Sequence, residues 1–220
     1  MRPHRLFAVL YDVLNGPLER AVLAPRRAVL LGDLTGEVLE IGAGTGASLR
    51  HYRRAARVIA AEPDPAMRAH LARALEGCRV PVQMSGVVAE TLPFPAAHFD
   101  AVVATCVLCT VDDPHRALAE AHRVLKPGGR LIVLEHVRGS GRLAARQDRI
   151  TPLWSRLAGG CHPNRDLPAA IELAGFAFEY REDFDPMPGW VPARPFLQGT
   201  ATTPIAGPRP VCPRSWSGRS

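Results

Sequence analysis

No apolar run in this sequence approaches the ~18 residues that a membrane-spanning helix needs. The first residues also lack the charged start, apolar core and small-residue cleavage site of a secretory signal peptide. Only five cysteines occur in 220 residues, and Cys78 and Cys212 stand alone, so no disulfide framework is expected. These absences predict a cytoplasmic protein in a reducing compartment.

Lysine is nearly missing, since Lys126 is the only one among 27 basic residues. The net charge of +6 comes from arginines that are spread along the chain. Aromatic residues make up only 6% of the sequence and do not interleave with a basic stripe, which is the pattern that nucleic-acid binding requires. No nucleic-acid partner is therefore expected.

Metal-ligand patterns are also sparse. Cys106-x-x-Cys109 has the spacing of a redox or zinc motif, but no second cysteine pair and no histidine pair follows it at zinc-finger spacing. We expect both cysteines to be small apolar residues at a buried strand end, because free cysteine ranks among the most buried residue types. The sequence predicts no metal site.

The most informative feature of the sequence is a run of glycines that follows an apolar stretch. Glu40-Ile41-Gly42-Ala43-Gly44-Thr45-Gly46 follows Val38-Leu39. Glycines at the end of a buried parallel strand let the backbone turn tightly and approach a ligand closely. A second apolar run ends at Glu62, about twenty residues on, where such sites carry a carboxylate for ribose hydroxyls. Together these features predict a bound nucleotide-like molecule.

Two kinds of nucleotide fit this pattern. Gly42-x-Gly44-x-x-Ala47 also matches the dinucleotide motif, so the glycines and Glu62 do not separate NAD from S-adenosylmethionine. Glu40 favours the second, because a carboxylate repels a pyrophosphate and attracts the methionyl ammonium, and the third glycine, Gly46, agrees with it. The alternative is that Glu40 caps a segment or pairs structurally with a nearby arginine.

Apolar β-rich runs alternate with helix-like stretches, which indicates an α/β fold with a Rossmann-like, mostly parallel seven-stranded sheet and helices on both faces. The expected strands are Val38–Ile41, Val58–Glu62, Val80–Val88, Phe99–Thr105, Arg130–Glu135, Phe176–Phe184 and Arg194–Ala201. The expected helices are Thr45–Arg54, Pro65–Glu76, Pro114–Leu125 and Leu167–Ala174. We expect N-terminal lid helices over 1–35, one domain over 36–203, and a disordered Pro- and Arg-rich tail over 204–220.

Several motifs resemble those of class I S-adenosylmethionine-dependent methyltransferases. They are Glu40–Gly46, Glu62-Pro63, Ala89-Glu90-Thr91-Leu92-Pro93-Phe94, Phe99-Asp100-Ala101-Val102-Val103 and Arg123-Val124-Leu125-Lys126-Pro127-Gly128-Gly129. Within that superfamily, Val107–Val111, Glu135-His136-Val137 and Gly159–His162 resemble the methyltransferase-like thiol S-methyltransferases. The N-terminal pair Tyr11-Asp12 resembles the N-terminal segment of ubiquinone and menaquinone C-methyltransferases and of bacterial phosphatidylethanolamine N-methyltransferases.

The resemblance implies S-adenosylmethionine as the cofactor, held by Glu40, Gly42, Ala43, Gly44, Gly46, Glu62, Pro63, Ala89, Glu90, Thr105 and Cys106. Many relatives have an Asp where this chain has Val88, so adenine recognition falls to backbone groups or to Glu90. If a base is needed, the first candidates are His136 and Asp12, and His162 is the third. The alternative for His136 is a hydrogen-bonded histidine at a strand end.

The acceptor that the resemblance favours is a small, largely apolar thiol, ahead of a quinone precursor or a phospholipid amine. A cofactor-binding protein without turnover is the competing hypothesis. Arg194-Pro195 stands where thiol-methyltransferase relatives often carry Pro-His, which favours another acceptor if that histidine takes part. Leu6–Leu14 is expected to form an amphipathic lid helix, and flanking arginines leave contact with a lipid surface open.

Overall fold

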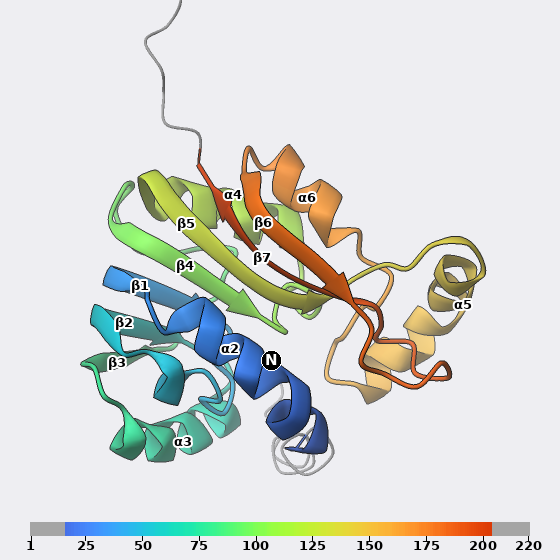
Figure 1. The fold of residues 1–220 in the computed structure, drawn as a ribbon, viewed down its shortest axis with the longest axis horizontal. Helices are drawn as coiled ribbons and strands as arrows, with labels where there is room; N and C mark the ends of the chain where they lie inside the picture. Colours follow the sequence, from blue (N-terminus) through green and yellow to red (C-terminus); the bar gives the residue numbers. More distant parts are fainter. Residues whose placement is uncertain (1–15, 204–220) are drawn as a thin grey trace, which may run out of the picture.

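The computed structural model describes residues 16–203 of the chain. The predicted lid helix Leu6–Leu14, the candidate base Asp12 and the tail 204–220 lie outside these residues. A seven-stranded sheet forms the centre of the described part (Figure 1). Within that part, no helix has both the length and the apolar character needed to cross a bilayer.

The sheet confirms the predicted fold class. Its strands are β1 Thr35–Ile41, β2 Arg54–Ala61, β3 Val82–Ser85, β4 Phe99–Thr105, β5 Leu125–His136, β6 Ala177–Phe184 and β7 Phe196–Thr202. They lie in the order β3-β2-β1-β4-β5-β7-β6. The first five are parallel, and β7 is antiparallel to both β5 and β6. The order reverses beside β1, and ligands of such sheets bind at the carboxyl ends of the strands near that point.

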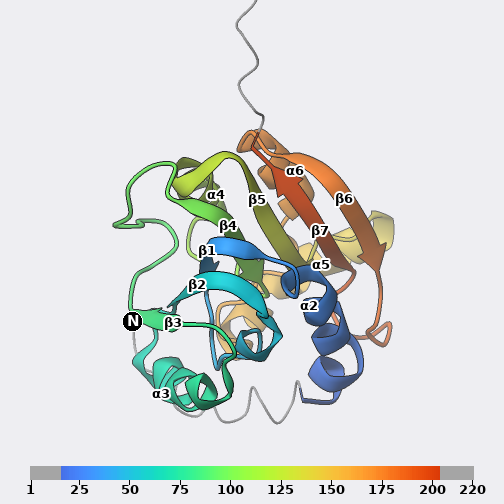
Figure 2. The same ribbon diagram turned by 60° about the vertical axis from the view of Figure 1, so that its left-hand side comes forward.

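Helices cover both faces of the sheet (Figure 2). They are α2 Ala24–Leu31, α3 Pro65–Ala74, α4 Pro114–Val124, α5 Gly141–Leu157 and α6 Leu167–Leu173, with a π-helical turn at Glu19–Leu23 and 3₁₀ turns at Leu49–His51 and Leu75–Gly77. One core joins the sheet to α4 and α6 through residues such as Leu118 and Ile171. The opposite core joins it to α2 and α3 through Leu31 and Leu71.

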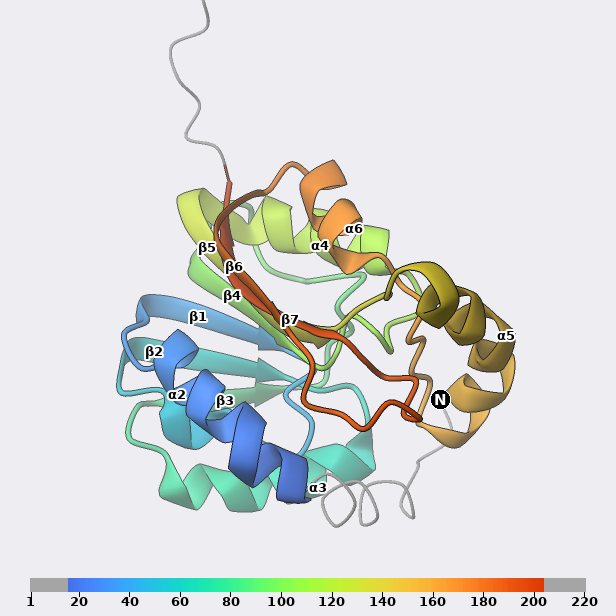
Figure 3. The same cartoon turned by 45° about the vertical axis from the view of Figure 1, so that its right-hand side comes forward.

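Helix α5 lies apart from both layers, beyond the strand ends and close to the loop that enters β7 (Figure 3). Its buried residues are polar, namely Gln147 and Thr151. The sequence analysis missed this helix, which is rich in arginine and contains Pro152.

The predicted helix Thr45–Arg54 is wrong. Gly46 has φ of +90°, and β2 already begins at Arg54, so only the 3₁₀ turn Leu49–His51 fits between them. The other predicted elements exist with shifted ends. The largest shifts are at the start of β5, which begins at Leu125, and at the start of β2, which begins at Arg54, while β3 is confined to Val82–Ser85.

Candidate cofactor and acceptor site

The glycine turn after β1 lies at the carboxyl edge of the sheet. Gly42, Gly44 and Gly46 have φ of +63°, +57° and +90°, values that favour glycine. A Cβ on Gly42 would lie 2.1 Å from Val107 Cγ2, so this glycine is needed for packing against the loop after β4. A Cβ on Gly44 would have no neighbour closer than 3.9 Å. The turn is therefore packed at Gly42 and open at Gly44.

Glu62 follows β2 and faces this turn. Its Oε2 accepts a hydrogen bond from Gly44 N at 2.9 Å, and its Oε1 accepts one from Asp64 N at 2.8 Å. Burial raises the pKa of Glu62, while the two backbone N–H groups and Arg68 oppose that rise. Arg68 Nη1 also donates to the carbonyl of Pro63 at 2.8 Å. Each carboxylate oxygen keeps a second lone pair, which can accept a ligand hydroxyl.

Glu40 lies under the turn and is only 1% exposed. Tyr52 donates its hydroxyl to Glu40 Oε2 at 3.0 Å. Burial raises the pKa of Glu40, and Ser48, the charge of Arg27 and Tyr52 lower it in part. These contacts agree with the alternative considered above, in which Glu40 pairs with residues of the protein itself. A cofactor contact of Glu40 stays a prediction.

Arg27 connects α2 to the same buried layer. Its Nη1 donates to Ser48 Oγ at 2.8 Å and to Thr105 Oγ1, while Nε pairs with Glu19 at 3.2 Å. Thr105, a predicted cofactor residue, is therefore bonded to this arginine. The sequence analysis missed Arg27, Ser48 and Tyr52, because nothing local marks a residue of a neighbouring helix or loop as a partner of Glu40.

The predicted adenine-side loop follows β3. Ala89 is buried, whereas the side chain of Val88 is 42% exposed. Glu90 Oε1 accepts hydrogen bonds from Asp112 N at 2.8 Å and Asp113 N at 3.3 Å. Glu90 thus holds the loop that leads into α4, and its role in adenine recognition stays a prediction.

Glu135 fixes the turn after β4. It is fully buried, and its Oε1 accepts from Val107 N at 2.7 Å and Leu108 N at 2.8 Å. Burial raises the pKa of Glu135. Cys106 lies on this turn with φ of +54°, and burial raises the pKa of its thiol to about 12. Cys106 is therefore a protonated thiol and no nucleophile at neutral pH.

His136 ends β5 and meets the loop after α5. Its Nε2 lies 3.1 Å from Cys161 Sγ, which also accepts a hydrogen bond from Trp154 Nε1 at 3.1 Å. A hydrogen bond from Cys109 and the charge of His136 lower the pKa of the Cys161 thiol. Burial lowers the pKa of His136, but the neighbouring Cys161 raises it by more. No local sequence pattern pairs Cys161 with His136, since 25 residues separate them.

His162 lies next to this pair. Its backbone N–H donates to Cys109 O at 2.8 Å, so the loop after α5 is tied to the loop after β4. The structure thus places His162 close to the His136–Cys161 pair, whereas Asp12 is outside the described residues, and the role of each as a base stays a prediction. All four cysteines within residues 16–203 are free thiols.

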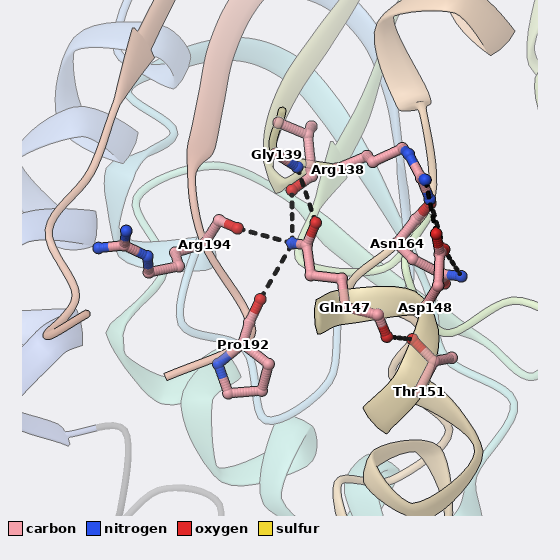
Figure 4. A network of polar contacts seen from close by, with 9 residues as sticks. Arg138, Gly139, Gln147, Asp148, Thr151, Asn164, Pro192 and Arg194 are labelled. Carbon is pink, nitrogen blue, oxygen red and sulfur yellow. Dashed lines mark hydrogen bonds and ion pairs between the residues drawn. The ribbon is translucent and has the colours of Figure 1, made fainter. Parts of the chain in front are cut away.

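A buried glutamine anchors α5 to the segment that precedes β7 (Figure 4). Gln147 Nε2 lies 3.3, 3.1 and 2.7 Å from the carbonyl oxygens of Val137, Pro192 and Arg194, and Gln147 Oε1 accepts from Gly139 N at 2.8 Å. The Arg194 side chain pairs with Asp185 at 2.9 Å. Arg194 therefore supports the segment before β7, at the position where a Pro-His pair was expected from the resemblance.

Comparison with known proteins identifies the family. A model of the Methyltransferase domain matches residues 39–133. Thiol S-methyltransferase TMT1B of Rattus norvegicus is 35% identical over 170 residues, which cover 74% of this chain and 69% of the relative. The chain belongs to the class I S-adenosylmethionine-dependent methyltransferases.

Other members of this methyltransferase family agree. Demethylmenaquinone methyltransferase of Thermus thermophilus is 34% identical over 175 residues, covering 74% of this chain and 80% of the relative. A solved S-adenosylmethionine-dependent methyltransferase of Thermotoga maritima, titled a possible histamine N-methyltransferase, superposes with a TM-score of 0.64 at 27% identity and covers 90% and 97% of the two chains. The enzyme is thus a methyltransferase with S-adenosylmethionine as its cofactor. The open space at Gly44 and the free lone pairs of Glu62 fit a ligand with a ribose diol.

Proposed function

We propose that this methyltransferase transfers the methyl group of S-adenosylmethionine to a small thiol. The similarity to a thiol S-methyltransferase over three quarters of the chain is the observation that carries the proposal. The state of His136 supports it. A thiol with an ordinary pKa near 8.5 is partly ionised at neutral pH without a base, and the Nε2 of His136 is already engaged by Cys161.

The proposed cofactor seat is the turn Gly42–Gly46 together with Glu62. Gly44 allows the methionyl part to approach the backbone, and Glu62 accepts hydrogen bonds from the two ribose hydroxyls. Ala43, Pro63, Ala89 and Cys106 line this seat in the proposal. Glu40, Thr105 and Glu90 act through their contacts with the turn and its neighbouring loops.

The proposed acceptor region lies at the carboxyl ends of β4 and β5, around Cys109, His136 and His162. A sulfonium is an activated electrophile, so alignment and exclusion of water supply most of the rate, up to about 7–11 kcal/mol. The thiolate sulfur attacks the methyl carbon, and S-adenosylhomocysteine leaves with the electron pair of the broken bond. His162, whose Nδ1 is buried without a hydrogen-bond partner among the described residues, is the proposed acceptor of a remaining thiol proton.

A quinone-precursor C-methyltransferase is the second candidate, because the demethylmenaquinone relative is similar over the same share of the chain. A carbon acceptor needs a base to generate its nucleophile. Asp12, which lies outside the described residues, is the base that this candidate requires.

The test measures S-adenosylhomocysteine released by purified protein with a small alkyl thiol, a demethylated quinone or a phosphatidylethanolamine dispersion. Thiol-dependent release in the wild-type protein is the expected result. Glu62→Ala serves as the cofactor-site control, and Glu179→Ala, at an exposed position of the edge strand β6, serves as the matched control that keeps activity. Release with the quinone or the lipid but not with the thiol would contradict the proposal.

A further inference from the structure

Three metal-ligand side chains meet at the acceptor region, although they come from separate segments. Cys109 follows β4, His136 ends β5, and Cys161 follows α5. Their residues are 3%, 6% and 7% exposed, and their ligand atoms all lie within 4.8 Å of one another. Such a group is invisible to a search for short cysteine motifs, because Cys109 and Cys161 are 52 positions apart in the sequence.

Hydrogen bonds from neighbouring segments hold the loops that carry Cys109 and Cys161 in place. The backbone of Val107 and Leu108 is bonded to Glu135, which fixes the turn that presents Cys109. The loop that carries Cys161 is tied to Cys109 O through His162 N, and Trp154 donates to the Cys161 sulfur. The ligand set is therefore preorganised by backbone contacts, as a binding site requires.

Two buried polar atoms of neighbouring β5 residues lie close to this cluster. His136 Nδ1 and Glu135 Oε2 are buried and have no hydrogen-bond partner among residues 16–203. Arg165 lies beside the same segment, where its Nη1 donates to Leu108 O at 2.6 Å. A divalent cation would neutralise two thiolates in this buried region.

We propose that Cys109, His136 and Cys161 bind one zinc ion. Two thiolates and one imidazole form a soft ligand set that suits zinc. Thiolates that share a zinc ion lie about 3.8 Å apart, given Zn–S bonds of about 2.3 Å, and the observed cluster has room for that spacing. Three protein ligands leave the fourth position open, which is the arrangement of catalytic rather than structural zinc sites.

The open position gives the zinc ion a role in the reaction, and this part rests on the proposed thiol acceptor. A zinc ion held by these three residues would lower the pKa of an acceptor thiol beside it, and His162 or water would take the proton that the thiol loses. The acceptor thiolate would then form a bond to the methyl carbon as the bond between that carbon and the cofactor sulfur breaks. The products are a neutral thioether, which is a weaker ligand and leaves, and S-adenosylhomocysteine. Zinc keeps its oxidation state throughout.

The test measures metal binding without any acceptor, so that it stays independent of turnover. Reduced full-length protein is freed of metal, and Zn²⁺ is titrated against a chromophoric chelator. Co²⁺ is used in a parallel titration as a spectroscopic probe. We expect one ion per chain, and with Co²⁺ a sulfur-to-cobalt charge-transfer band and the strong visible bands of tetrahedral coordination.

Cys109→Ser, Cys161→Ser and His136→Ala should each weaken binding by more than about 10-fold. Cys78→Ser is the matched control and should bind as the wild-type protein does, and circular dichroism verifies the fold of each variant. Metal binding that is unchanged in Cys109→Ser and Cys161→Ser overturns the proposal. So does the absence of stoichiometric binding when both thiols are shown to be reduced, or a Cys109–Cys161 disulfide that persists under reducing conditions.

The result separates the two proposals. Zinc bound by the three residues in a protein that does not methylate thiols would refute the thiol acceptor and leave the metal site standing. Thiol methylation by protein that binds no zinc would refute the metal site alone.

Discussion

The proposed cofactor seat depends most directly on the charge of Glu62. Its carboxylate accepts hydrogen bonds from Gly44 N and Asp64 N and is oriented toward the open side of the turn. Asp64 and Arg68 are the charged groups that face it, with opposite effects. A ribose hydroxyl that donates to Glu62, as proposed, would bind the ionised form more tightly, because protonation turns one carboxyl oxygen into a donor and removes the charge.

This charge predicts a pH dependence of cofactor binding. Burial raises the pKa of Glu62 above its ordinary 4.5, so the carboxylate becomes protonated as the pH falls toward that value from neutral. Affinity for S-adenosylhomocysteine should therefore be constant above the raised pKa and fall below it. Calorimetric titration from pH 8 to pH 5 measures this. Glu62→Gln should bind more weakly with a flat profile, and an equal pH dependence in that variant would assign the titration to another group.

A substitution at Gly44 is expected to weaken cofactor binding while the protein still folds. Gly44→Ala adds a methyl group that meets no protein atom closer than 3.9 Å but occupies the space that we propose for the cofactor. Gly141→Ala is the matched control, because Gly141 has a similar φ of +53° and no neighbour within 4 Å. Both variants should lose about 1–2 kcal/mol of stability from the left-handed backbone. Calorimetry should then show a Kd raised at least about 10-fold for Gly44→Ala alone. Equal affinities in the two variants would place the cofactor elsewhere.

At the scale of elements, the parallel strands were predictable and the connections between them less so. A buried apolar run such as Phe99–Thr105 predicts a strand even when the neighbouring strands are unknown. The segment from Thr45 to Arg54 is different, because its conformation depends on left-handed glycines and on Ser48, which turns inward to meet Arg27. Helix α5 also escaped prediction, and polar contacts of its buried residues Gln147 and Thr151 help to hold it.

Those polar contacts predict a large effect of Gln147→Leu. The leucine has a similar volume but leaves Gly139 N and the three backbone carbonyls without their buried partner. Since an unsatisfied buried group costs about 1–3 kcal/mol, the free energy of unfolding should fall by about 3 kcal/mol. Urea denaturation measures it.

Arg149→Ala is the control, because Arg149 is exposed on the same helix. It should change stability by less than about 0.5 kcal/mol. A similarly small change in Gln147→Leu would mean that α5 is held by something other than this network.

At the scale of the whole molecule, the sequence predicted the cofactor half better than the acceptor half. The glycines and Glu62 follow the consecutive, adjacent strands β1 and β2, so their places in the chain bring them together at one edge of the sheet. The cluster of Cys109, His136 and Cys161 combines three distant segments, one of which follows the unpredicted α5. A fold of this class hosts many acceptors, so the acceptor depends on such side chains and not on the sheet.

The most direct test of the central proposal follows the methyl group itself. Purified protein is incubated with S-adenosylmethionine that carries a deuterated methyl group and with a small alkyl thiol, and the products are identified by mass spectrometry. The proposal predicts a thioether that carries the intact deuterated methyl group, in a one-to-one ratio with S-adenosylhomocysteine. A protein that binds the cofactor and methylates the quinone precursor or the phospholipid amine, but leaves the thiol unmodified, would contradict it.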